Sequence, residues 1–311
     1  MPATSVSSSI PCPRGDFPGL WVALVTPFQP GGGIDHAALR RLVSRLAAEG
    51  ARGLVACGST GEAAALDGAE QLAVLDTVLD AAQAAGGLPV VMGAGGHHLG
   101  EMRAWLRTLN GRPLAGVLAP APHYIRPSQA GARDWFTALA DDSATPLVLY
   151  DIPYRTGATL ARDTLLALAA HPNIHAIKDC GGDAAKTLAL IADGRLQVLA
   201  GEDLNLFATV AQGGAGAIAA CANLHTRRFA EVIRLLRHGE LAAARALWLP
   251  LLPFIEAAFA EPSPAGLKAA LALHGEMSDE LRPPMQPAGA ALRERLAAIN
   301  RTLNEPPAPA R

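Results

Sequence analysis

Short apolar runs alternate along the chain with longer segments whose apolar residues recur at helical spacing. The apolar runs are continuous instead of alternating with polar residues, which is typical of strands in a parallel sheet covered by helices. Turn residues bound each run, so each run has the length of a single strand. The expected strands are Leu20–Thr26, Gly53–Cys57, Pro89–Gly93, Gly116–Ala119, Leu147–Asp151, His175–Asp179, Gln197–Gly201 and Gly216–Ala219.

The segments between these strands predict the helices of a βα repeat. Eight βα units are the number that closes a barrel, whereas an open doubly wound sheet would rarely need so many. We therefore predict an α/β fold, a TIM (β/α)8 barrel, over residues 18–239. The expected helices include Asp35–Gly50, Ala69–Ala85, Gln129–Asp141, Ala161–Ala170, Ala184–Ala192 and Asn205–Gln212.

The strand pattern stops near residue 240. Glu240–Phe259, Pro264–His274 and Gly289–Leu303 predict three Ala/Leu-rich helices, so residues 240–304 are expected to form a helical appendage to the barrel. Residues 1–17 are rich in Ser and Pro and lack the apolar segment of a secretory signal, which predicts a disordered tail. A second, Pro-rich tail is expected at 305–311.

Composition narrows the classes of partner. The net charge of -2 and the lack of a Lys/Arg-rich run argue against a nucleic acid or an acidic membrane surface. No run of 18 or more apolar residues occurs, which argues against a membrane span. The four cysteines show no zinc spacing and His97-His98 lacks a third ligand, so no metal is expected. Scattered free thiols indicate a reducing compartment, and we expect a cytoplasmic protein.

The basic residues show one bias with chemical content. Only three lysines occur, Lys178, Lys186 and Lys268, and Lys178 ends an expected strand. Active sites of (β/α)8 barrels gather at the C-terminal ends of their strands. An apolar interior can lower the pKa of a lysine from its ordinary value of about 10.4 and so supply a free amine as nucleophile. The alternative is a structural cation that pairs with Asp179.

Tyr150 ends the preceding expected strand, in LVLYDIPYRTG. Neighbouring strands lie about 4.8 Å apart, so its hydroxyl can meet the Lys178 amine and shuttle protons. The structural alternative is a core tyrosine bonded to a backbone carbonyl. Arg155 follows in the same loop, where it could bind a substrate carboxylate in bidentate fashion or be an ordinary surface arginine.

The segment GSTGE, Gly58–Glu62, follows the second expected strand. Its glycines permit close backbone approach, and the hydroxyls of Ser59 and Thr60 can hold a carboxylate or relay a proton. The same segment could be a turn and N-cap before a helix. By itself it indicates an anion site and leaves the chemistry open.

Taken in order, these segments resemble the dihydrodipicolinate synthase/N-acetylneuraminate lyase family of class I pyruvate aldolases. The resemblance implies that Lys178 forms a Schiff base with pyruvate and that no metal or nucleotide cofactor takes part. It spans about residues 18 to 240 and rests on VALVTPF, GSTGE, APHYIRPSQAG, YDIPYRTG, AIKDCGG, GED and GGAGAI.

The resemblance also assigns the site residues. Lys178, Tyr150, Ser59 and Tyr124 form the implied catalytic group, in which Tyr124 completes the proton relay of a neighbouring subunit. That arrangement implies at least a dimer, commonly a homotetramer built from two tight dimers. The implied substrate-binding residues are Gly58, Thr60, Arg155 and Ile218.

Arg155 and Tyr124 favour the lysine-biosynthetic synthases of the family, in which the arginine binds the carboxylate of L-aspartate 4-semialdehyde. An aldolase or dehydratase acting on a 2-keto-3-deoxy sugar acid or an N-acetylneuraminate-like substrate is the alternative, and a catalytically silent binding protein is a third. The sequence departs from the synthase pattern at Ser59, Asp151, His123 and Gly68. Gly68 stands where an inhibitor-contacting histidine can occur, which argues against feedback inhibition by lysine.

Overall fold

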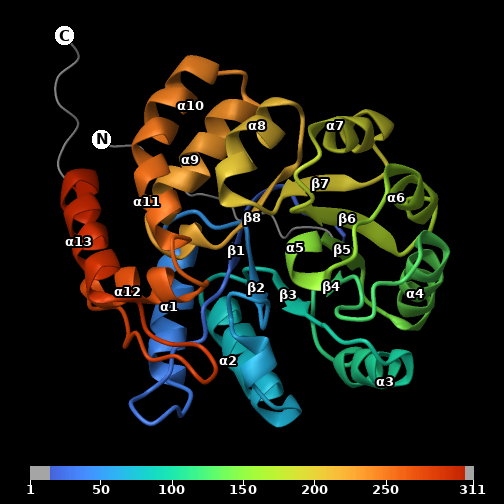
Figure 1. Ribbon diagram of the computed structural model, residues 1–311, viewed down its shortest axis with the longest axis horizontal. Helices are drawn as coiled ribbons and strands as arrows, with labels where there is room; N and C mark the ends of the chain where they lie inside the picture. The colour runs from blue at the N-terminus through green and yellow to red at the C-terminus, as the bar shows by residue number, and fades with distance from the viewer. Residues whose placement is uncertain (1–14, 305–311) are drawn as a thin grey trace, which may run out of the picture.

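Eight parallel strands pair in sequence order and close on themselves, because β1 is bonded to both β2 and β8 (Figure 1). The computed structural model describes residues 15–304. The predicted (β/α)8 barrel is confirmed, and the expected strands match the observed ones to within a few residues. The strands are β1 Gly19–Ala23, β2 Gly53–Ala56, β3 Val90–Gly93, β4 Gly116–Pro120, β5 Leu147–Asp151, β6 Ile174–Asp179, β7 Gln197–Ala200 and β8 Gly216–Ala219.

Helices surround the barrel on its outside (Figure 1). Those of the barrel are α1 His36–Ala48, α2 Gly68–Ala84, α3 Leu99–Leu109, α4 Gln129–Asp142, α5 Pro153–Thr156, α6 Arg162–Leu168, α7 Ala184–Asp193, α8 Leu206–Ala211 and α9 Thr226–Arg237. The C-terminal ones are α10 Leu241–Trp248, α11 Leu252–Ala258, α12 Ala265–Leu273 and α13 Ala290–Asn304. Four short 3-10 turns are η1 Ala63–Ala65, η2 Asp203–Asn205, η3 Cys221–Asn223 and η4 Leu249–Leu251.

The first C-terminal helix differs from the prediction. We expected one helix over Glu240–Phe259, but the structure has α10, the turn η4 and α11. Pro250 and Pro253 lie at the starts of η4 and α11. Proline lacks the N–H of the helical ladder and is tolerated in the first turn of a helix, so the two prolines divide the segment.

Side chains alternate along each strand between the barrel interior and the layer beneath the helices. On β6, Ala176 belongs to the interior cluster, as does Cys180 just after the strand. Ile177 belongs to the layer beneath the helices. The period of two therefore turns Lys178 into the barrel. On β5 the same pattern turns Tyr150 inward, where it joins the interior cluster.

The segment Leu241–Ala258 is long and apolar enough to cross a membrane, with a mean hydropathy of 1.4. It also carries Arg245 and Glu256, and its side chains Phe254 and Ile255 are completely buried against the rest of the protein. We interpret this segment as a pair of helices that packs against the rest of the protein, because these apolar side chains are buried within it.

The packed part of the chain begins before the domain boundary that we expected. Phe17 is buried, and its N–H donates to Gln197 Oε1 at 2.7 Å. Residues 15–17, which we assigned to the N-terminal tail, therefore close one end of the barrel. The rest of the two expected tails, 1–14 and 305–311, together with Cys12, lies outside the described residues.

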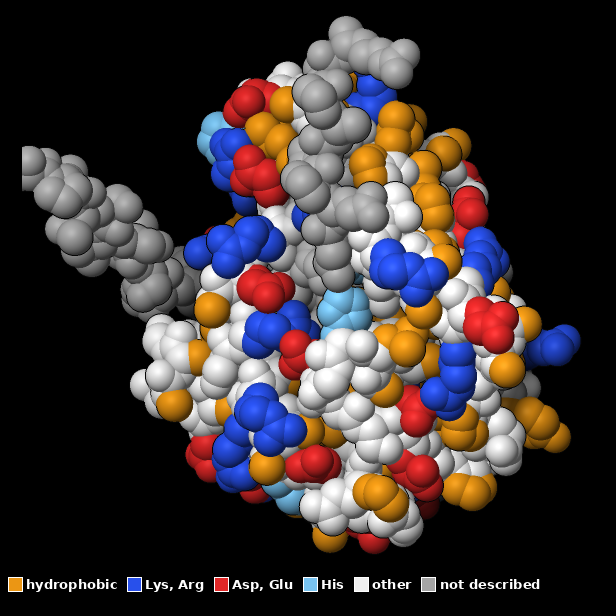
Figure 2. Space-filling model, turned by 90° about the vertical axis from the view of Figure 1, so that its left-hand side faces the viewer, with side chains coloured by type: hydrophobic (Ala, Val, Ile, Leu, Met, Phe, Trp, Pro, Cys, Tyr) orange, Lys and Arg blue, Asp and Glu red, His pale blue; other side chains and the backbone are white. Residues whose placement is uncertain are grey.

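Figure 2 shows one face of the molecule, on which basic and acidic side chains are interspersed. They do not gather there into a single basic surface of the kind that follows a nucleic-acid backbone. This agrees with the small net charge of the chain.

Candidate active site

Tyr150 and Lys178 lie side by side at the C-terminal ends of β5 and β6. The two residues are partners in the strand register. Lys178 Nζ lies 4.5 Å from the centroid of the Tyr150 ring, and both side chains are buried. The strand pairing therefore brings together the amine and the phenol that were proposed from the sequence, in a site from which most water is excluded.

Burial raises the pKa of Tyr150 well above its usual range, and the nearby Cys180 adds to this effect. A hydrogen bond with Ser59 and the positive charge of Arg155 act in the opposite direction but do not outweigh burial. The phenol is therefore protonated at neutral pH and available as a proton donor beside Lys178.

The loop after β2 carries Gly58, Ser59 and Thr60 between two residues in the left-handed region of backbone space. Cys57 and Glu62 both have a φ of 53°. Non-glycine residues adopt this conformation only where the surrounding structure enforces it, commonly at functional sites. Within the loop the Thr60 side chain is buried and Ser59 is exposed, with Gly58 between these extremes.

Neighbouring segments constrain both ends of this loop. Thr26 Oγ1 donates to the Gly61 carbonyl at 2.7 Å, which ties the segment after β1 to the loop. A Cβ on Gly93 would lie 2.3 Å from the Cys57 carbonyl oxygen, so only glycine on β3 leaves room for the strained Cys57 backbone.

Glu62 joins the same loop to the C-terminal helices. Its Oε1 lies 2.5 Å from Lys268 Nζ on α12, and both side chains are almost completely buried. Its Oε2 accepts a hydrogen bond from the Arg282 N–H at 3.1 Å. Lys268 also donates to the Glu280 carbonyl at 2.8 Å. The appendage is therefore part of the framework that holds the loop after β2.

Arg155 lies in the short helix α5 and is exposed. It borders a cavity of about 790 Å³, together with Tyr154, Glu202 and residues of the segment that follows α11. Tyr154 donates a hydrogen bond to Glu202 Oε1 at 2.9 Å. Arg155 stacks over the Tyr154 ring at 5.8 Å. A positive and a negative side chain thus line this cavity, and the charges of both act on the phenol of Tyr150.

Asp203 completes the far wall of the site. Its carboxylate accepts hydrogen bonds from the N–H groups of Ala220, at 3.2 Å, and Cys221, at 2.8 Å, just after β8. Burial raises the pKa of Asp203 to about 6, although the two backbone bonds and the charge of Lys178 lower it. Ile218 on β8 belongs to the interior cluster below this wall.

Tyr124 is the proposed site residue that does not join the others within one chain. Its side chain is 88% exposed and its φ is 71°. Its N–H bonds to the Thr156 carbonyl at 3.3 Å, so its backbone is tied to the α5 loop while its ring points into solvent. A role in a proton relay therefore needs a second subunit.

Several supporting residues were not found from the sequence. Lys186, buried against Asp151, and Lys268, buried against Glu62, were noted only as lysines. Their rarity was the available signal, because all three lysines of the chain are buried. Gly201 was assigned no role, yet a Cβ there would lie 2.8 Å from Lys178 Cγ, so its lack of a side chain makes room for the lysine stem.

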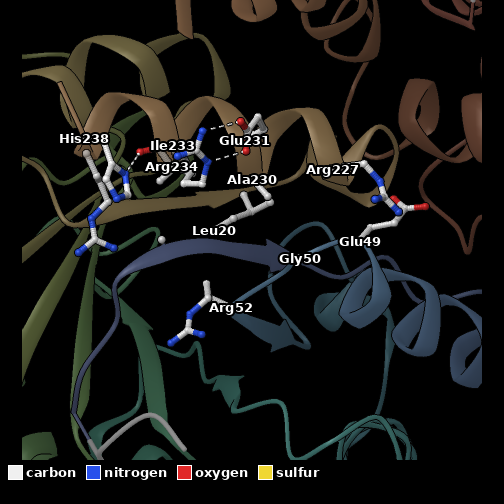
Figure 3. A pocket seen from close by; sticks show the side chains of 12 residues that line it. Leu20, Glu49, Gly50, Arg52, Arg227, Ala230, Glu231, Ile233, Arg234 and His238 are labelled. Atoms are coloured by element: carbon white, nitrogen blue, oxygen red, sulfur yellow. Dashed lines mark hydrogen bonds and ion pairs between the residues drawn. The ribbon is translucent and has the colours of Figure 1, made fainter. Parts of the chain in front are cut away.

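A second cavity, of about 800 Å³, lies at the opposite end of the barrel, where β1 begins (Figure 3). Leu20, Arg52, Ala230 and Arg234 are among the residues that line it. It is about as large as the cavity beside Arg155, but none of the residues proposed for catalysis lines it. Within residues 15–304, no group of three or more His, Cys, Asp or Glu side chains could hold a metal ion.

Comparison with known proteins shows extensive similarity. The model of the dihydrodipicolinate synthetase family matches residues 16–303. The chain is 40% identical over 289 residues to the 4-hydroxy-tetrahydrodipicolinate synthase of Sorangium cellulosum, covering 92% of this chain and 95% of that protein. The enzyme of the same name from Trichlorobacter lovleyi is 39% identical over 286 residues, with coverages of 91% and 97%.

A solved structure shows the same similarity in three dimensions. The chloride-inhibited dihydrodipicolinate synthase from Acinetobacter baumannii, complexed with pyruvate, is 30% identical to this chain. The two superimpose with a TM-score of 0.88 over 91% of this chain and 98% of that one.

Proposed function

The chain belongs to the dihydrodipicolinate synthetase family, and from this premise we propose that it is a 4-hydroxy-tetrahydrodipicolinate synthase. The enzyme condenses pyruvate with L-aspartate 4-semialdehyde through a Schiff base on Lys178, in lysine and diaminopimelate biosynthesis. The observation that carries the proposal is the contact between Lys178 and Tyr150, 4.5 Å from Nζ to the ring centroid, beside a hydroxyl-bearing loop.

The reaction begins when the free Lys178 amine adds to the keto carbon of pyruvate. Loss of water gives the imine, and Tyr150, held protonated by burial, supplies the proton that makes the hydroxyl a leaving group. Ser59 hydrogen-bonds to Tyr150 and is placed to exchange that proton. Thr60 and Gly58 bind the pyruvate carboxylate, and Ile218 forms the apolar floor below it.

Tyr150, deprotonated by the preceding step, takes up a methyl proton, which converts the imine to an enamine whose carbon attacks the aldehyde. The amino group of the bound semialdehyde then attacks the imine carbon, which closes the ring and releases Lys178. Arg155 binds the carboxylate of the semialdehyde, because its guanidinium stands at the mouth of the cavity and suits a bidentate contact. No metal or other cofactor takes part in this sequence.

We also propose that the enzyme is a homotetramer, a dimer of dimers, in which Tyr124 enters the relay of the neighbouring subunit. The exposed ring and left-handed backbone of Tyr124 support this arrangement. A cytoplasmic location is proposed as well, because the three described cysteines are free thiols. Sedimentation equilibrium of the wild type and of Tyr124→Ala, combined with activity assays, tests the assembly.

Reductive trapping tests the proposed chemistry. Pyruvate and borohydride should add the mass of a reduced pyruvate adduct to the peptide that contains Lys178, and Lys178→Ala should show no such adduct. Purified enzyme loaded with pyruvate should then consume L-aspartate 4-semialdehyde in preference to a panel of sugar-acid aldehydes. Adduct formation without turnover of the semialdehyde would assign the chain to a different aldolase reaction of the family.

A further inference from the structure

The two proposed catalytic residues are each followed by an aspartate that bonds to helix α7. Tyr150 and Lys178 are register partners, as are Asp151 and Asp179. Asp179 Oδ2 accepts a hydrogen bond from the Thr187 hydroxyl at 2.5 Å. The Asp151 carboxylate forms an ion pair with Lys186, the residue that precedes Thr187 in the same helix.

The ion pair between Asp151 and Lys186 is buried. The side chain of Asp151 is 0% exposed and that of Lys186 is 3% exposed. Gly181 lies against it, and a Cβ there would stand 2.7 Å from Asp151 Oδ2. Removing two charges from water is costly, and such a pair contributes little net stability compared with apolar side chains. The presence of this pair beside the site is explained better by the geometry that it imposes on the neighbouring backbone.

That geometry concerns the loop of residues 152–159, which carries Arg155. Asp151 Oδ1 accepts the Leu160 N–H at 3.2 Å, and Lys186 Nζ donates to the Leu160 carbonyl at 3.4 Å. The pair therefore binds the residue before the loop and the residue after it, and so closes the base of the loop.

The loop is also braced internally. The hydroxyl of Thr156 donates to Ile152 O at 3.1 Å and lies 3.0 Å from Ala158 O, which links the two halves of the segment. Arg155 forms no ion pair with any residue of the described chain, and its guanidinium only stacks on Tyr154. Its position is therefore set by the loop. The Asp151–Lys186 pair holds the loop at its base, and hydrogen bonds from Tyr124 N–H to Thr156 O at 3.3 Å and from Gln129 to Thr159 O at 2.7 Å hold it further along.

We propose that the Asp151–Lys186 ion pair positions Arg155 and thereby determines the affinity of the enzyme for the anionic aldehyde. The inference rests on the proposed function of the site. Because the pair acts on the loop and not on the Lys178 amine, its loss impairs the second substrate and leaves Schiff-base formation intact. Lys186 and Asp151 are positioning residues, since neither reaches the reacting atoms.

Steady-state kinetics of Lys186→Met test the proposal. The KM for L-aspartate 4-semialdehyde should rise roughly 10- to 100-fold, as expected for a misplaced binding group. The KM for pyruvate and the yield of the borohydride-trapped adduct should stay within about twofold of wild type, the scale of a merely peripheral change. Lys186→Arg, which keeps the charge, should restore most of the aldehyde affinity.

Thr187→Val is the matched control, because it removes the neighbouring bond of α7 to Asp179 without touching the base of the loop. It should leave the aldehyde KM unchanged. An equal rise in Thr187→Val, or an equal rise in both substrate KM values of Lys186→Met, would overturn the proposal. If Lys186→Met does not fold, the neutral double variant Asp151→Leu/Lys186→Met, which buries no unpaired charge and offers no acceptor to the Leu160 N–H, supplies the same measurement.

Amide hydrogen exchange separates this inference from the proposed function. The Leu160 N–H is bonded to Asp151 Oδ1, so this amide should exchange faster in Asp151→Leu/Lys186→Met than in wild type, whatever aldehyde the enzyme uses. The wild type could fail to consume the semialdehyde while the Leu160 amide of the variant loses protection. In that case the substrate assignment is wrong, but the Asp151–Lys186 pair still holds the base of the loop. Unchanged exchange at Leu160 would refute the proposal that the pair holds the base of the loop.

Discussion

Lys268 is the side chain that connects the C-terminal helices to the loop carrying Ser59 and Thr60. Replacing it with methionine keeps most of its volume and removes the charged nitrogen. The change deletes the contact with Glu62 Oε1 at 2.5 Å and the hydrogen bond to Glu280 O at 2.8 Å. It also removes the cation that lies 4.2 Å from the Phe28 ring centroid.

Breaking a buried ion pair from one side costs about 3–5 kcal/mol, because the remaining charge stays buried without its partner. Glu62 retains the hydrogen bond from the Arg282 N–H, at 3.1 Å. Part of its charge is therefore still compensated. We expect Lys268→Met to lower the free energy of unfolding by about 3 kcal/mol, the lower end of that range.

Urea denaturation of four proteins measures this effect. The double variant Glu62→Gln/Lys268→Met buries no unpaired charge, so it should be more stable than Lys268→Met alone. Arg112→Met serves as the control, since it breaks the partly exposed pair with Asp76 and should cost less than about 1 kcal/mol. A Lys268→Met variant as stable as wild type, or one no less stable than the double variant, would refute the reasoning.

Three further predictions follow from named side chains. Arg155→Ala should lower kcat/KM for the aldehyde by an amount equivalent to about 2–4 kcal/mol, with little effect on kcat/KM for pyruvate. An equal loss for both substrates would contradict the assignment of Arg155 to the aldehyde carboxylate. Burial lowers the pKa of His225 from 6.5 to about 4. As the pH falls, the unfolded chain is therefore protonated at this histidine before the folded protein is. The free energy of unfolding should fall between pH 6.5 and 4 by up to about 3 kcal/mol. His225→Asn, which tolerates the local φ of 54°, should remove this slope in thermal melts. The hydrogen bond from Arg282 lowers the pKa of Glu70 from 4.5 to about 2. The stabilisation of the folded protein by this pair is therefore present above pH 4.5 and is lost as the pH falls toward 2. Glu70→Gln should accordingly cost about 1 kcal/mol at pH 7, since the pair is partly exposed, and the difference from wild type should vanish near pH 2.

The architecture followed from the sequence because a parallel barrel has a local signature. Each strand is buried on both faces and reads as an unbroken apolar run, as in LVLY before Asp151. Eight such runs, with helical segments between them, leave few other folds. The same logic indicated where chemistry gathers, since the C-terminal ends of all the strands of a parallel barrel lie on one face. Lys178, Tyr150 and the segment Gly58–Glu62 could therefore be chosen from their places at strand ends.

The sequence did not determine which groups at those ends touch. The Tyr150–Lys178 contact depends on the register between β5 and β6. The ion pairs of Lys186 with Asp151 and of Lys268 with Glu62 join segments that are far apart in the chain. Hydrophobic periodicity reports how a residue faces the core, but it carries no information about its partner in a distant element. Only the closed barrel, with its helices in place, decides those partners and with them the position of Arg155.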